Sequence, residues 1–178
     1  MDTFHFESAV VCSDIHLSKD SEKLSKSFIF WLKKFCLEKL KSKPEWLLIL
    51  GDLFDAWIGD DILEEECPPD YLLALVTILK KISFSGIKIG IMHGNRDFLI
   101  GEKFCDAVDA ELLPEEILLC HYKTKSTYLL MHGDQLCTDD VEHQVFRKIV
   151  QSTEWKHEFL KKNLTNRLSI AEKMRDES

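Results

Sequence analysis

The stretch "WLLILGDLFDAWIGDD", residues 46–61, decides the fold. It opens with five apolar residues, and a continuous apolar run of this length indicates a β-strand buried on both faces, as in parallel sheets. Four carboxylates follow, those of Asp52, Asp55, Asp60 and Asp61. So much negative charge at the end of a strand calls for a cation, a basic side chain or water beside it.

Three more apolar runs of strand length occur at 9–14, 87–95 and 127–134. Segments with helical spacing of apolar residues lie between them, at 22–43 and 71–86. Strand, helix and strand in alternation predict βαβ units and an α/β fold. Residues 97–126 are expected to be mixed, with a short helix near 101–108 and a weak strand near 115–122. From residue 141 onward the pattern is helical and polar.

Composition narrows the function classes. The chain has 178 residues, which is enough for one domain with a substantial core. A net charge of -8 argues against a general nucleic-acid binder. No stretch approaches the roughly 18 uninterrupted apolar residues of a membrane span. The six cysteines form no C-x-x-C pair, so we expect reduced thiols and a cytoplasmic protein.

Potential metal ligands follow all four apolar runs. They are Asp14 and His16, then Asp52, then Asn95, then His132. The successive intervals from Asp14 to Asp52, from Asp52 to Asn95 and from Asn95 to His132 are 38, 43 and 37 residues, each about one βαβ crossover. Functional groups of α/β sheets gather at the carboxyl ends of strands, so these side chains are expected to meet. Carboxylate, imidazole and amide oxygen suit manganese, iron or zinc, and Asp52 can bridge two ions.

The motifs "SDIHL", "GDLFD", "GNRD" and "HGD" together resemble the calcineurin-like metallophosphoesterases. More narrowly, "GDLFDAWIGDD", "HGNRDFLIG" and "HGDQLCTDD" resemble the UDP-2,3-diacylglucosamine pyrophosphohydrolase family of lipid A synthesis in Gram-negative bacteria. The resemblance runs from about residue 9 to the end. It implies an αββα sandwich of which residues 1–140 form the first half of the core. Residues 141–178 would belong to a helical insertion that acts as a lid.

The resemblance also implies an activity and a site. The family hydrolyses UDP-2,3-diacylglucosamine to 2,3-diacylglucosamine 1-phosphate (lipid X) and UMP, through attack of a metal-bound hydroxide on the α-phosphorus. Two Mn²⁺ ions would be held by the five ligands Asp14, His16, Asp52, Asn95 and His132. Substrate contacts would come from Asn95, Arg96, Asp140 and Ser178. Asp52 and Arg96 would be the catalytic residues.

Arg96 also has a physical argument of its own. A pyrophosphate is charged on both phosphoryl groups, and the planar guanidinium offers a fork of donors that matches phosphoryl oxygens. The alternative is a surface salt bridge with Asp97. Asp60 and Asp61 are expected to form an acidic rim or to hold a nearby basic group. Trp57 and Ile58 are expected either to contact a lid or to pack beneath their loop.

The last segment differs in charge from the rest of the chain. Residues 1–140 hold 15 basic and 25 acidic side chains, whereas residues 141–178 hold 8 and 6. A basic amphipathic helix pair predicts contact with an anionic membrane surface. The resemblance places such an enzyme at the cytoplasmic face of the inner membrane, with no obligate protein partner. The alternative is an ordinary solvated helical hairpin.

One motif of the resembled family, "G-H-x-H", does not occur among the seven histidines. It would give one more histidine to each metal, so we interpret the chain as a truncated form of a longer enzyme. Two other functions therefore stay open. One is a phosphoesterase for another nucleotide or phosphate ester. The other is a metal-binding fragment without turnover.

Overall fold

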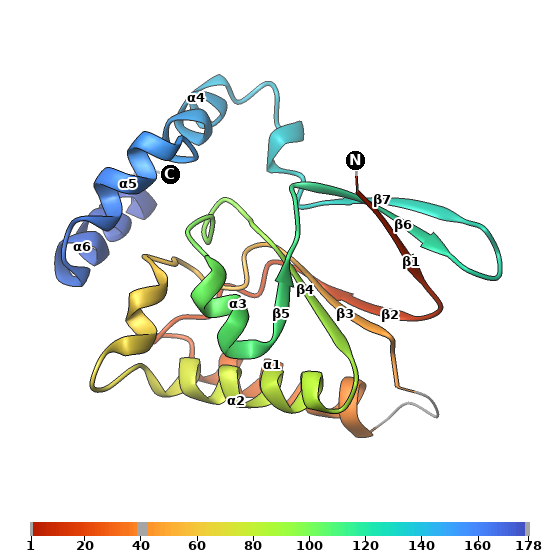
Figure 1. The fold of residues 1–178 in the computed structure, drawn as a ribbon. Helices are drawn as coiled ribbons and strands as arrows, with labels where there is room; N and C mark the ends of the chain where they lie inside the picture. The colour runs from red at the N-terminus through yellow and green to blue at the C-terminus, as the bar shows by residue number, and fades with distance from the viewer. Residues whose placement is uncertain (1, 39–42, 177–178) are drawn as a thin grey trace.

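The computed structural model describes residues 2–38 and 43–176. Figure 1 shows the arrangement of its elements. The strands are β1 (Asp2–Phe6), β2 (Ala9–Cys12), β3 (Trp46–Leu50), β4 (Lys88–Met92), β5 (Ala110–Leu112), β6 (Glu116–His121) and β7 (Thr127–Met131). The α-helices are α1 (Glu22–Leu32), α2 (Asp70–Phe84), α3 (Glu102–Val108), α4 (Val141–Val150), α5 (Thr153–Leu160) and α6 (Leu164–Asp176). Short helical turns are the π-helical η1 (Lys33–Glu38) and the 3-10 turns η2 (Asp60–Glu64) and η3 (Asp134–Leu136).

A four-stranded parallel sheet, in the order β2-β3-β4-β5, forms the centre. Successive side chains of β3 enter two different cores. Leu47 and Ile49 face the layer of α1, α2 and α3, while Leu48 and Leu50 face the second sheet. This alternation explains why all five residues of the run 46–50 are apolar, since both faces of the strand are covered.

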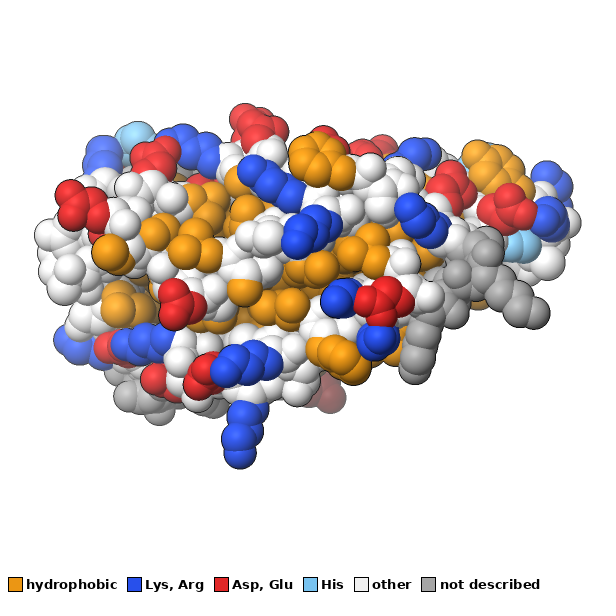
Figure 2. Space-filling model, turned by 90° about the horizontal axis from the view of Figure 1, so that it is seen from below, with side chains coloured by type: hydrophobic (Ala, Val, Ile, Leu, Met, Phe, Trp, Pro, Cys, Tyr) orange, Lys and Arg blue, Asp and Glu red, His pale blue; other side chains and the backbone are white. Residues whose placement is uncertain are grey.

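Helices α1 and α2 cover one face of the central sheet (Figure 1). In α2 the buried positions Leu72, Leu75, Leu79 and Ile82 recur at helical spacing. Figure 2 looks at this side of the molecule from below. Hydrophobic side chains run along its middle between charged side chains of both signs. Apolar side chains such as Phe84 are exposed here.

The second sheet differs from the sequence prediction. The run 127–134 does form a strand, but β7 pairs antiparallel with β6 in a separate sheet of order β1-β6-β7. The prediction that it follows one more βαβ crossover was therefore wrong. Burial on both faces was wrong as well, because Thr127, Tyr128 and Leu129 are exposed on this edge strand. The weak strand near 115–122 is confirmed as β6, and β1 was not predicted.

The helices α4, α5 and α6 lie together at the end of the chain, above the central sheet in the view of Figure 1. Each sends one basic side chain to the rest of the molecule. Arg147 binds Asp134 and Glu115, Lys156 donates to the carbonyl of Phe98, and Arg167 binds Asp61. Within residues 2–38 and 43–176, no helix combines the length and apolarity needed to cross a membrane.

The core can be tested with two phenylalanines. Phe104 of α3 is fully buried against the rings of Phe54 and Trp57, whereas Phe84 is 82% exposed. Phe104→Ala is expected to lower the free energy of unfolding by about 3–5 kcal/mol, because a cavity remains. Phe84→Ala, the same chemical change, is expected to cost less than about 0.5 kcal/mol. Urea unfolding measures both, and equal losses would contradict the assignment of the core.

Candidate metal centre

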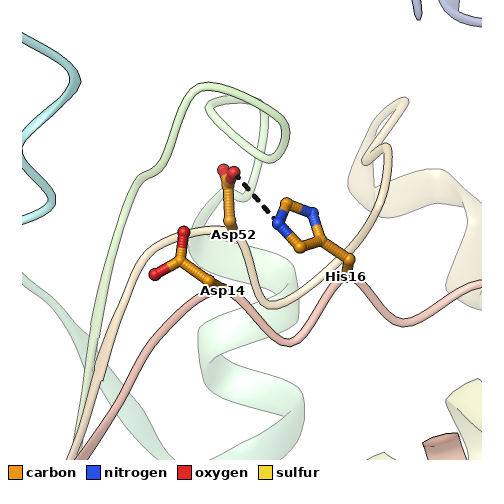
Figure 3. A group of neighbouring side chains, drawn as sticks. All are labelled: Asp14, His16 and Asp52. Atoms are coloured by element: carbon orange, nitrogen blue, oxygen red, sulfur yellow. Dashed lines mark ion pairs between the residues drawn. The ribbon is translucent and has the colours of Figure 1, made fainter. Parts of the chain in front are cut away.

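Three side chains meet where β2 and β3 end. The loop after β2 carries Asp14 and His16, and the loop after β3 carries Asp52. Each of the three offers one ligand atom, and these atoms lie within 4.8 Å of one another. Figure 3 shows the three side chains beside one another, and its dashed line joins His16 Nε2 to Asp52 Oδ2, which are 3.7 Å apart. Backbone hydrogen bonds from Asp14 N to Gly51 O and from His16 N to Asp52 O hold the two loops side by side.

The other oxygen of Asp52 faces a second group of ligand atoms. Asp52 Oδ1 lies 3.8 Å from Nε2 of His132, which follows β7. The same Nε2 lies 3.2 Å from Oδ1 of Asn95, which follows β4. His132 Nδ1 donates to the carbonyl of Leu50 at 2.9 Å, so Nε2 is the ring nitrogen that faces the site. One carboxylate thus faces a different imidazole with each of its oxygens.

The carboxylate of Asp52 is buried, where a negative charge is unfavourable. Its side chain is only 4% exposed. Burial raises the pKa of its carboxyl, opposed by the N–H of Arg96 and by the charges of His132 and His16. A buried carboxylate without a matching positive charge is costly, and a bound cation would remove that cost.

Asp97 organises the two loops behind this site. It is fully buried, and its carboxylate accepts hydrogen bonds from the N–H groups of Gly94, Asp52 and Leu53 at 2.8–3.2 Å. Burial raises the pKa of Asp97 to about 6, although these N–H donors lower it. The alternative that Asp97 forms a surface salt bridge with Arg96 does not fit this burial. Sequence reasoning missed the role of Asp97, and its only signal was the acidic residue that ends "GNRD".

The backbone at the site is held in unusual conformations. Asp14, His16 and Asp52 all have φ between 51° and 56°, a left-handed region that is uncommon for residues other than glycine. Gly51 has φ of 85°, and a Cβ there would lie 2.7 Å from the backbone of Gly94 and from His132 Nδ1. A glycine is therefore required for the β3 and β4 loops to approach each other.

These donors fit divalent metal ions. Carboxylate, imidazole and carboxamide oxygen are the ligands of manganese, iron and zinc sites. Cys12 is the cysteine nearest to Asp14 in sequence, and burial raises the pKa of its thiol to about 12. Among the described residues, no cysteine sulfur belongs to the group of ligand atoms that lie within 4.8 Å of one another. Asp14, His16 and Asp52 form a group whose ligand atoms lie close enough together to hold a metal ion.

A cavity of about 360 Å³ opens beside Asn95 and Arg96, which both line it. Its other polar lining includes Asp140, which also caps α4 by accepting from His143 N at 2.9 Å. The apolar lining comes from the loops after β3 and β4 and from the last three helices: Trp57, Ile58, Phe98, Leu99, Phe146, Val150, Trp155, Phe159, Ala171 and Met174. Glu142, His143, Arg147 and Gln151 add polar groups from α4 and its end, so the lining is mixed. The apolar chamber is the part of the cavity that the ten apolar side chains line.

The remaining predicted positions have different roles. Asp61 binds the basic side chain of Arg167, so of the two expectations for Asp61 the structure shows the pairing with a basic group. Asp60 instead accepts from the N–H groups of Gly101 and Phe104 and from Trp57 Nε1. Trp57 and Ile58 are buried beneath their loop and also line the cavity. Ser178 lies outside the described residues.

Comparison with known proteins fits this geometry. The family model of calcineurin-like phosphoesterases matches residues 8–174. The chain belongs to the calcineurin-like phosphoesterase family. Membership confirms the α/β fold class and implies the use of divalent metal ions.

Similar proteins share one name within this family. The chain is similar to proteins named UDP-2,3-diacylglucosamine hydrolase from Bordetella pertussis (38% identical, 94% of this chain, 61% of the relative). The corresponding protein of Haemophilus influenzae strain PittGG is 42% identical (93% and 65%), and that of Serratia proteamaculans is 39% identical (93% and 64%). The chain spans about three fifths of the length of these relatives.

Asp97 gives a direct test of the loop geometry of this phosphoesterase. Asp97→Asn turns one carboxylate oxygen into an N–H₂ group that faces backbone N–H donors. We expect divalent metal affinity to fall by about 10- to 100-fold, as when other supporting partners of ligands are lost. Isothermal titration with Mn²⁺ measures it. The exposed Asp106→Asn is the control and should bind as the wild type does. Unchanged affinity in Asp97→Asn would refute the supporting role.

Proposed function

We propose that this protein is a metal-dependent hydrolase that cleaves the pyrophosphate bond of UDP-2,3-diacylglucosamine. The products would be 2,3-diacylglucosamine 1-phosphate and UMP. The observation that carries the proposal is the cavity that begins at Asn95 and Arg96 and continues into an apolar chamber. A substrate with a charged diphosphate and two acyl chains requires both parts. The names of the similar proteins favour this substrate over other phosphoesters.

The proposed metal centre would hold two Mn²⁺ ions. Asp14 and His16 would hold one ion, Asn95 and His132 would hold the other, and Asp52 would serve both. The two oxygens of Asp52 face different imidazoles, which supports this division. Two such ions would lower the pKa of bound water and neutralise phosphate charge. Asp97 and the carbonyl of Leu50 would keep the protein ligands oriented.

Arg96 is proposed to bind the diphosphate. Its backbone N–H donates to Asp52 Oδ1 at 2.9 Å, which fixes the start of its side chain beside the ligand cluster. The side chain lines the cavity, where a guanidinium can hold phosphoryl oxygens by two parallel hydrogen bonds. Asp140, at the same cavity, is proposed to bind the sugar. A contact between Ser178 and the substrate is also still predicted.

We also propose that α4 touches an anionic membrane surface at the cytoplasmic face of the inner membrane. Val141, Val145 and Ile149 are exposed and recur at intervals of four, so they lie on one side of the helix. Phe146 and Val150 turn instead toward the cavity. The basic excess of residues 141–178 would favour anionic lipids. An acylated substrate could then enter from the bilayer beside the helix that lines its chamber.

Arg96 separates the pyrophosphatase from a general phosphoesterase. In the full-length protein, Arg96→Ala should keep its metals but lose about 30- to 1,000-fold in turnover of UDP-2,3-diacylglucosamine, which corresponds to about 2–4 kcal/mol. Arg96→His should not recover that rate, because imidazole lacks the bidentate fork. Steady-state kinetics with metal analysis measures both variants.

The control for Arg96 is the exposed Lys103, which pairs with Glu64; neither residue lines the cavity. Lys103→Ala should turn over as the wild type does. Full pyrophosphatase activity in Arg96→His would contradict the proposed role. Hydrolysis of simple phosphodiesters without any hydrolysis of UDP-2,3-diacylglucosamine by the wild type would favour the general phosphoesterase.

The membrane contact predicts a loss of vesicle binding. Val145→Asp with Ile149→Asp should weaken binding to vesicles that contain phosphatidylglycerol by at least about tenfold, because each buried aliphatic side chain contributes about 1.5–3 kcal/mol. Co-sedimentation measures it. Leu73→Asp, at an exposed position of α2, is the control and should bind normally. Equal binding by all three proteins would leave α4 without a membrane role.

A further inference from the structure

A buried arginine joins the last helix to the loop after β3. Arg167 of α6 is 2% exposed. Its Nη1 donates to the carbonyl of Ile58 at 2.5 Å and to Asp61 Oδ1 at 2.9 Å, and its Nη2 pairs with Asp61 Oδ2. Both terminal nitrogens of the guanidinium thus bind the Asp61 carboxylate, and one of them also binds the backbone carbonyl of Ile58. Such a contact fixes direction as well as distance.

The loop is shaped to receive this guanidinium. Gly59 lies between the two residues that Arg167 binds. Its φ of 129° is a backbone conformation that residues other than glycine rarely adopt. A Cβ at Gly59 would collide with Arg167 Nη1, and it would lie 2.8 Å from Leu160 Cδ2 of α5. The backbone at Gly59 therefore leaves space for Arg167 and for the end of α5 at the same time.

The same loop and the same helix form facing parts of the cavity lining. Trp57 and Ile58 line it directly before Gly59. Ala171 and Met174 line it from α6, four and seven residues after Arg167, so all three share one helix face. Any rotation of α6 about Arg167 would move Ala171 and Met174 relative to Trp57.

The attachments of the other two helices are of a different kind. Arg147 of α4 binds Asp134 and Glu115, which do not line the cavity. Lys156 of α5 donates one hydrogen bond to the carbonyl of Phe98. Lys156 and Arg167 each bind the backbone of a residue that lines the cavity, Phe98 and Ile58. Of the three basic side chains, Arg167 is the one that pairs with a single carboxylate through both terminal nitrogens.

We propose that Arg167 is a positioning residue that, through Asp61 and Ile58, sets the shape of the apolar chamber between α6 and the loop after β3. It acts on the binding of the acyl chains and leaves the ligand cluster unchanged. The proposal rests on the proposed function for its substrate. The role of Arg167 in holding α6 against the loop after β3 does not depend on which substrate binds. Figure 1 shows α6 beside the segment that carries Asp61.

The test uses the full-length protein with Arg167→Met, which keeps much of the apolar stem and removes the guanidinium. The KM for UDP-2,3-diacylglucosamine should rise about tenfold or more while kcat changes by less than about threefold, as expected when ground-state binding is lost. For the acyl-free substrate bis(4-nitrophenyl) phosphate, kcat/KM should stay within about twofold. Arg167→Lys should fall between Arg167→Met and the wild type, because one ammonium cannot bind both oxygens in the same plane.

The matched control is Lys173→Met on the same helix, since Lys173 is exposed. It should leave KM unchanged. Equal KM values in Arg167→Met and Lys173→Met would overturn the proposal, and so would an equal loss of rate on both substrates by Arg167→Met. Metal content checks that the ligand cluster is intact.

Hydrogen exchange separates this inference from the proposed function. The amides of α6 and of residues 57–61 should exchange faster in Arg167→Met than in Lys173→Met, without any substrate present. If the wild type fails to hydrolyse UDP-2,3-diacylglucosamine, the proposed function is wrong, and the exchange result still decides the positioning role. Unchanged exchange in Arg167→Met would overturn that role.

Discussion

The carboxylate of Asp97 is the interaction on which the polar edge of the central sheet depends. Without a single acceptor between them, the loops after β3 and β4 would each present unpaired N–H groups to the interior. By binding Gly94, Asp52 and Leu53 together, Asp97 fixes the direction of the Asp52 carboxylate. The direction of Asp52 in turn decides which imidazole each of its oxygens faces. A side chain that touches no ligand atom of the site therefore determines how the site is arranged.

The central sheet and most of the ligand cluster could be predicted because their signals are local. The apolar run 46–50 needs a cover on both faces, and this requirement leaves few positions for it other than the middle of a layered α/β sheet. Once the strands are parallel, their carboxyl ends share one edge, so Asp14, Asp52 and Asn95 must approach one another. No knowledge of distant contacts is required for this step.

The parts that could not be predicted depend on contacts between distant residues. An apolar run such as 127–131 indicates a strand, but it does not say which neighbour the strand pairs with or in which direction. Arg167 and Asp61 are 106 residues apart, so the sequence offered a basic partner for Asp61 as one possibility but could not say which residue it would be. Such roles follow only from the folded arrangement.

The origin of His132 has a thermodynamic consequence. His132 extends from the sheet β1-β6-β7, whereas Asp52 and Asn95 extend from the central sheet. A cation held by all three joins the two sheets, so its binding free energy adds to the free energy of their association. By mass action, a cation at 100 times its dissociation constant stabilises the folded state by about 2.7 kcal/mol. The concentration of metal would then set the stability of the folded state as well as the activity of the site.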